Sequence, residues 1–198
     1  MCPVKTAMTL VKDLFRVRPP VRTGMTPTVI RTITHEVSRL EVAVGTAFGD
    51  FRDRYERAVP ELDAGRLDEL VRSGAAWDTV LRAAWENAPY DFVRYWRLDV
   101  TAIMRLAGDH WKCAEYLMGN HTIAQRMYTR DPAVMLYAPL RTAIYEDAEG
   151  VTWFSVDQPS TRFASFGDPA IAKVGVELDH KLATLLGHLG VPVPEALG

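Results

Sequence analysis

The chain has 198 residues, of which 48% are hydrophobic and 24% charged, a composition that argues against extended disorder and suits one folded domain. A net charge of −2 and a pI of about 6.2 provide no basic surface for nucleic acid or anionic lipid. No apolar run approaches the roughly 20 residues of a membrane span, and the first residues lack the continuous apolar core of a secretory signal. We therefore expect a cytoplasmic protein of bacterial type that binds neither nucleic acid nor membrane.

Proline and glycine interrupt the start of the chain, so residues 1–28 are predicted to form an arm without regular structure. The interrupting residues are Pro19, Pro20, Gly24 and Pro27. Residues 29–198 are expected to form a single α+β domain. The two cysteines of the chain, Cys2 and Cys113, have no zinc-binding spacing and are not expected to form a disulfide.

The first half of the predicted domain combines one strand with three helices. Residues 39–45 begin with alternating apolar and polar side chains, as a half-buried strand does. Apolar residues then recur at steps of three and four over 48–59, which predicts a helix that ends at a proline. Residues 63–73 and 76–87 indicate two further short helices, which together form a helical insertion at about 60–88.

Strands dominate the second half of the sequence. Residues 90–100 and 111–117 alternate with a period of two, and a helical turn at about 101–106 separates them. Asn120 is placed to cap a helix over 121–130.

The chain is predicted to close with a long strand, a hairpin and a long helix. A strand over 134–146 contains Pro139, which implies a bulge or an edge position. A hairpin turn leads to a strand at 151–157, and residues 160–166 are expected to be a loop. Apolar residues continue at helical spacing over 169–190, which predicts a helix that Gly190 stops.

Three segments of this second half resemble the DUF302 family, a group of small bacterial and archaeal domains of unknown function. They are WKCAEYLMGN, HTIAQRMYTRDP and VMLYAPLRTAIYEDAEGVTWFSVDQPS. The final FGDPAIAKVGVELDHKLATLL also looks like the last helix of that family. The resemblance implies a β-α-β4-α order, with a curved antiparallel sheet packed by a long C-terminal helix, similar to TBP-like and helix-grip domains. Many helix-grip proteins hold a small molecule between the sheet and the helix.

A carboxylate on the predicted strand 111–117 is the first candidate for chemistry. Glu115 shares a strand face with Trp111 and Cys113. If this face is interior, the carboxylate needs a partner or a raised pKa, because burying a bare charge is costly. Arg94 or Arg141 could supply the partner. The alternative is that Glu115 is solvent-exposed and forms an ordinary cross-strand ion pair.

Tyr137 and Arg141 are the second candidate pair, since residues four apart on a strand share a face unless Pro139 shifts the register. A Tyr beside an Arg suits a bound carboxylate, enolate or phenolate. We therefore predict a site between the sheet and helix 169–190, in which Glu115, Tyr137 and Arg141 do the acid–base work. The predicted ligand-binding residues are Arg94, Trp96, Trp111 and Cys113.

Three functions remain open from the sequence. The first is a cofactor-independent enzyme or binding protein for an apolar or aromatic small molecule. The second is a non-enzymatic module, possible as a homodimer, that uses an aromatic surface for protein contacts. The third is a haem or metal protein that uses His110, His121 or Cys113, although no metal-binding spacing supports it. The sequence lacks phosphate-loop and nucleophile-elbow motifs, and no cofactor is predicted.

Overall fold

The computed structural model describes residues 28–198, and residues 34–198 form one compact unit. The predicted arm, except for its last residue, lies outside the described residues. The unit contains a five-stranded antiparallel sheet with the order β1-β5-β4-β3-β2. The strands are β1 (Arg39–Ala43), β2 (Val93–Asp99), β3 (Lys112–Gly119), β4 (Leu140–Glu146) and β5 (Thr152–Asp157).

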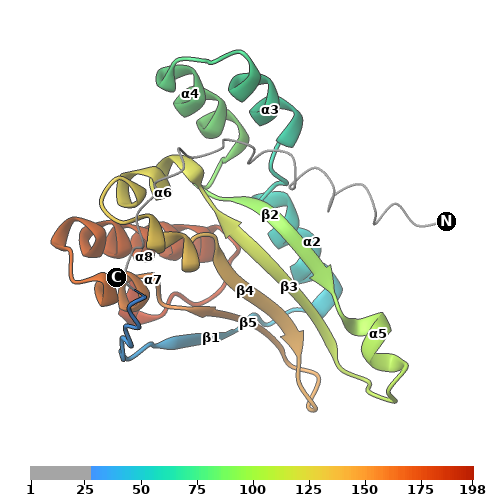
Figure 1. Ribbon diagram of the computed structural model, residues 1–198. Coiled ribbons are helices and arrows are strands. Elements are labelled where there is room, and N and C mark those ends of the chain that lie inside the picture. Colours follow the sequence, from blue (N-terminus) through green and yellow to red (C-terminus); the bar gives the residue numbers. More distant parts are fainter. Residues whose placement is uncertain (1–27) are drawn as a thin grey trace. The chain divides into compact units, whose positions relative to one another are not determined.

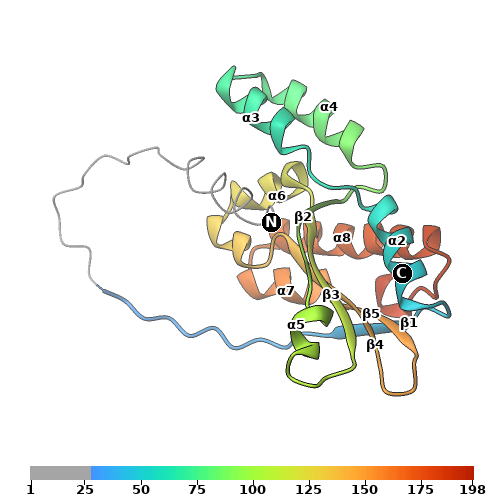
Figure 2. The ribbon, with the colours of Figure 1, turned by 90° about the vertical axis from the view of Figure 1, so that its right-hand side faces the viewer.

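Helices connect the strands or follow the last of them (Figures 1 and 2). They are α2 (Phe48–Ala58), α3 (Ala64–Arg72), α4 (Trp77–Asn87), α5 (Thr101–Arg105), α6 (His121–Tyr128), α7 (Pro159–Phe163) and α8 (Pro169–His188). The 3-10 helices are η1 (Pro132–Leu136), η2 (Ala164–Phe166) and η3 (Glu195–Leu197). The predicted β-α-β4-α order of an α+β domain is therefore present, with α3 and α4 inserted between α2 and β2.

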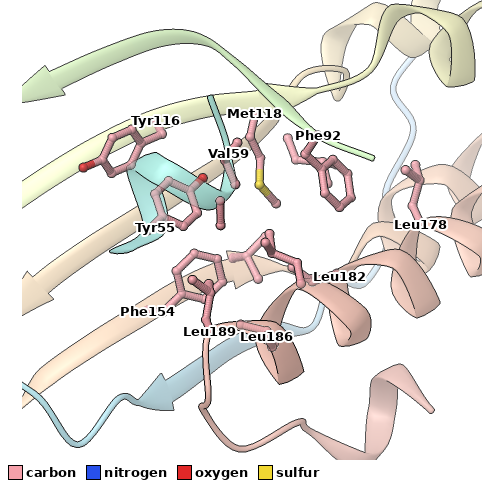
Figure 3. Packing of buried hydrophobic residues seen from close by; sticks show 14 of the residues in the cluster. Tyr55, Val59, Phe92, Tyr116, Met118, Phe154, Leu178, Leu182, Leu186 and Leu189 are labelled. Carbon is pink, nitrogen blue, oxygen red and sulfur yellow. The ribbon is translucent and has the colours of Figure 1, made fainter. Parts of the chain in front are cut away.

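One face of the sheet forms the core because alternate residues of each strand point toward α2 and α8. On β3 these are Ala114, Tyr116 and Met118, all fully buried. Figure 3 shows Tyr116 and Met118 beside side chains from α2, from β5 and from the apolar side of α8. The opposite face of the sheet, here called the open face, carries the remaining residues of each strand.

Helix α8 has a side-chain cap at its start and buried apolar residues at helical spacing. The Asp168 side chain accepts hydrogen bonds from the backbone N–H groups of Ala170 and Ile171, at 2.7 and 3.3 Å. Buried residues recur along α8 at the predicted three- and four-residue steps, and Gly190 follows its end with a positive φ of 68°.

The prediction for residues 134–146 is wrong in its first half. Residues 132–136 form η1 instead, and the strand begins only at Leu140. Pro139 has no N–H to donate to a neighbouring strand, so the ladder starts just after it. The predicted loop at 160–166 is also wrong, because it consists of α7 and η2.

A β-bulge changes the faces of β2. Arg94 pairs with Met118 and Trp96 pairs with Leu117, so Tyr95 is an extra residue between them. Arg94 therefore lies on the core side, whereas Trp96 lies on the open face. The period of two predicted over residues 90–100 would place both side chains on one face, and the bulge makes that prediction wrong.

Helices α3 and α4 form a helical hairpin next to α6, beyond the end of the sheet (Figures 1 and 2). The Asp63 side chain caps α3 by accepting a hydrogen bond from the Arg66 backbone N–H at 2.8 Å. Gly74, with a φ of 61°, lies in the turn between the two helices. Both helices lie close to their predicted positions.

Candidate functional site

An apolar pocket lies where the sheet, α6 and α8 meet, and we call it the α6 pocket. Its volume is about 160 Å³. Its apolar wall includes Phe92, Ile123, Met127, Leu140, Phe163 and Leu178. Tyr95, Asn120 and His121 also line the pocket, at what we call its polar edge, while almost all of the pocket's own surface is apolar. A mainly apolar lining with few polar residues is usual for a small-molecule site.

Local backbone features place the polar edge. The bulge in β2 turns Tyr95 toward the pocket. Gly119 allows Pro139 to approach, because a Cβ at Gly119 would lie only 3.3 Å from the Cα of Pro139, and the Tyr95 ring lies on the same side of Gly119. The Asn120 side chain caps α6 at the backbone N–H of Thr122, at 2.9 Å, and thereby fixes the position of His121 at the start of the helix.

Tyr95 and His121 form a hydrogen-bonded pair at this edge, with 3.1 Å between the Tyr95 hydroxyl oxygen and Nδ1 of His121. Burial raises the pKa of Tyr95 to about 12 and lowers the pKa of His121. Both groups are therefore neutral near pH 7. A neutral Tyr–His pair that shares one hydrogen bond keeps one donor and one acceptor free in either imidazole tautomer. The pair can thus bind one polar group of a ligand and exchange a proton with it.

His121 also lines a second hollow on the other side of α6. This groove, of about 340 Å³, lies between α6 and the α3–α4 hairpin. The α3–α4 helical insertion therefore lies next to His121, which is part of the polar edge of the α6 pocket.

Two residues of the predicted catalytic trio line a different pocket. Tyr137 and Arg141, together with Asp157 and Arg162, border a hollow of about 220 Å³, here called the Arg141 pocket. Arg141 and Asp157 belong to the open face, so this pocket does not lie between the sheet and α8. Tyr137 precedes β4 and does not share a strand with Arg141, but the turn at Pro139 brings both to the same hollow.

The charged groups of the Arg141 pocket already have partners. Arg141 forms an ion pair with Glu115 at 2.6 Å, and Arg162 pairs with Asp157. The Arg162 guanidinium also lies 4.9 Å from the centre of the Tyr137 ring, a cation–π contact. The Tyr137 hydroxyl lies 3.5 Å from Nε2 of His35.

Glu115 points to the open face and not to the interior. Its predicted catalytic role depended on an interior position, so this condition is not met. Its side chain is 24% exposed and that of Arg141 is 75% exposed, so the two form a cross-strand surface pair. Arg94 does not contact Glu115. It pairs with Glu56 at 3.6 Å and donates a hydrogen bond to the Val59 carbonyl at 2.7 Å.

The other predicted ligand-binding residues do not line the α6 pocket. Trp96 is exposed on the open face, and Trp111 is exposed at the start of β3. Cys113 is a free thiol whose pKa is raised by burial and by the nearby carboxylates of Glu115 and Asp99. A protonated thiol is a weak nucleophile, so the raised pKa argues against a nucleophilic role for Cys113.

We predict a small effect for Glu115→Gln. The exchange removes one surface ion pair, and such pairs contribute about 0–1 kcal/mol. The free energy of unfolding, measured by urea denaturation, should fall by no more than about 1 kcal/mol, and occupancy of the α6 pocket should not change. Loss of ligand binding in a folded Glu115→Gln variant would contradict this prediction and would show that Glu115 contributes to binding.

Within residues 28–198 no three His, Cys, Asp or Glu side chains come together as a metal site. His110 and His121 lie at opposite ends of β3. No described helix has both the length and the apolar character that crossing a bilayer requires.

Comparison with known proteins decides the family. The model of DUF302, a domain of unknown function, matches residues 73–189. The chain belongs to the DUF302 family. The match includes α4 and every element from β2 to α8, whereas β1, α2 and α3 precede it.

A solved DUF302 structure shares the fold. The crystal structure of an uncharacterized conserved DUF302 protein from Bacillus stearothermophilus has a TM-score of 0.55 and 17% sequence identity. The alignment covers 76% of this chain and 97% of that one. No curated protein matches this DUF302 chain.

Sequence reasoning did not place Tyr95 in the site, and it considered His121 only as a metal or haem ligand. The signal that could have found the pair is the order Gly119-Asn120-His121 directly after a strand. A glycine at a strand end often marks a close approach of another group, and Asn is a strong helix cap.

Proposed function

We propose that the chain binds a small apolar or aromatic molecule in the α6 pocket, with one polar atom of the ligand at Tyr95 and His121. The observation that carries this proposal is the coincidence of an apolar hollow of about 160 Å³ with a neutral, hydrogen-bonded Tyr–His pair at its edge. An apolar protein cavity of about 150 Å³ accommodates benzene. The expected ligand portion is therefore one aromatic ring or an alkyl group of similar size.

The α6 pocket supports this function better than the Arg141 pocket does. Arg141 and Arg162 are already neutralised by Glu115 and Asp157, so a ligand would have to displace or share these pairs. Tyr95 and His121 retain one free donor and one free acceptor. This arrangement also supports cofactor-independent proton transfer to a bound ligand, in line with a helix-grip type of site between sheet and helix.

Tyr95→Phe tests the polar part of the proposal with phenol and benzene as probes. Both should bind the wild type, with a dissociation constant of roughly 1 mM for phenol. One hydrogen bond contributes about 1 kcal/mol, so phenol should bind roughly fivefold more tightly than benzene, and Tyr95→Phe should remove this preference. Competition between the two probes in NMR titrations measures it.

The two parts of the proposal fail separately. An unchanged phenol preference in Tyr95→Phe would exclude the polar role of Tyr95 while leaving the pocket as the binding site. Absence of binding for both probes in the wild type would exclude the pocket itself.

A second candidate is a non-enzymatic association module, and exposed apolar side chains favour it. Trp96 and Leu98 are exposed on the open face, and the side chains of Trp77 and Trp85 are exposed on α4. Clustered exposed apolar groups often mark protein contacts. A homodimer is compatible with binding in the α6 pocket, which lies on the other side of the sheet from the open face.

A further inference from the structure

Helix α4 presents an apolar stripe to the outside of the α3–α4 hairpin. The stripe consists of Trp77, Leu81 and Trp85, which are 45%, 41% and 76% exposed. Four residues make one helical turn plus about 40°, so the three side chains lie on one side of the helix. Ala84 is buried on the side that packs against the rest of the domain. We call the three exposed residues the α4 stripe.

The α4 stripe has the same order of side chains, Trp-Leu-Trp, in both directions along the helix. A tryptophan lies about 6 Å before Leu81 and another lies about 6 Å after it. A twofold axis through Leu81 would lay a second α4 antiparallel on the first. Each Trp77 would then lie against Trp85 of the second copy, and the two Leu81 side chains would meet at the axis. Such a self-complementary patch is what an isologous dimer requires.

The charges beside the α4 stripe fit the same axis. Asp78 and Arg82 are both exposed and lie on the same flank of the stripe. Among the described residues neither has an ion-pair partner. In the antiparallel arrangement Arg82 of one copy and Asp78 of the other lie on facing flanks, offset by about 3 Å along the axis. An arginine side chain spans this offset, so two equivalent ion pairs would form.

We infer that the α4 stripe is a homodimer interface, in which two copies of this chain pair their α4 helices antiparallel about Leu81. This inference goes beyond ligand binding and does not depend on the α6 pocket. An interface built on one short helix lies at the small end of the known range, below about 1,200 Å². The complex is therefore weak, and it forms in a concentration-dependent way.

Charge reversal tests the antiparallel geometry. Asp78→Arg places like charges opposite each other in a homodimer, and so does Arg82→Asp. Each variant alone should therefore be monomeric in sedimentation velocity at concentrations where the wild type dimerises. An equimolar mixture of the two variants should dimerise again, because both ion pairs are then restored, one with its native polarity and one with its polarity reversed. Loss of an intrahelical Asp78–Arg82 interaction cannot explain such a recovery, since mixing does not change either helix.

An apolar position provides the second test. Leu81→Glu should abolish the dimer, whereas Val71→Glu on the exposed side of α3 should leave it unchanged. Circular dichroism serves as the control, and each variant should keep the wild-type helix content. Three results would overturn the inference: a wild type that stays monomeric at all concentrations, a mixture of the charge variants that stays monomeric, or a dimer that survives Leu81→Glu and is lost in Leu98→Glu on the open face.

Discussion

Ala124→Phe should abolish binding of phenol while the protein remains folded. Ala124 lines the α6 pocket from α6 and is 8% exposed. The substitution adds one aromatic ring, about the volume that a cavity of roughly 150 Å³ accommodates. The added ring would therefore occupy the space of the ligand, and phenol affinity should fall by a factor of about 100, corresponding to some 2.7 kcal/mol.

Ala102→Phe is the matched control, because Ala102 is an exposed position of a helix that does not border the α6 pocket. It should leave phenol affinity unchanged. Calorimetric titration of both variants makes the comparison, with the thermal unfolding midpoint as a check on folding. Wild-type affinity in Ala124→Phe would show that phenol binds elsewhere.

Gly175→Val should destabilise the fold by about 2–3 kcal/mol, which is the usual cost of overpacking a filled interior. Gly175 lies in α8 where α7 crosses it. A Cβ at this position would lie 3.0 Å from the Cα of Ser160 and 3.1 Å from the Cβ of Phe163. The two helices would have to separate, and Phe163 is part of the wall of the α6 pocket.

Gly187→Val in the same helix is the control, since a Cβ there meets no atom within 4 Å. Valine has a higher helix propensity than glycine, so this variant should be unchanged or slightly more stable. Urea denaturation gives both free energies of unfolding. Equal stability of the two variants would contradict the close packing of α7 on α8.

Elements with a strong period and a cap could be predicted from the sequence. Helix α8 has apolar residues at helical spacing, and Asn120 caps α6 as expected. The order of strands and helices could be predicted from these elements, and the family resemblance could be recognised in the same segments. These features depend on local sequence, which a single chain displays fully.

The site could not be predicted in the same way because non-local contacts determine it. Strict alternation along β2 would place Arg94 and Trp96 on one face, whereas the extra residue Tyr95 at the bulge puts them on opposite faces. Which face of a strand is buried depends on which face of the sheet α2 and α8 cover. The alternating pattern of β3 is the same whichever face is covered, so the pattern could not identify the buried face. Glu115 was therefore a reasonable interior candidate from the sequence and a surface residue in the fold.

Intermolecular NOEs between phenol and the protein test the central claim most directly. The account predicts contacts from the phenol ring protons to the methyl groups of Ile123 and Leu178, which both line the α6 pocket. Contacts only to Leu136 and Leu117 at the Arg141 pocket, or no contacts at saturating phenol, would contradict it.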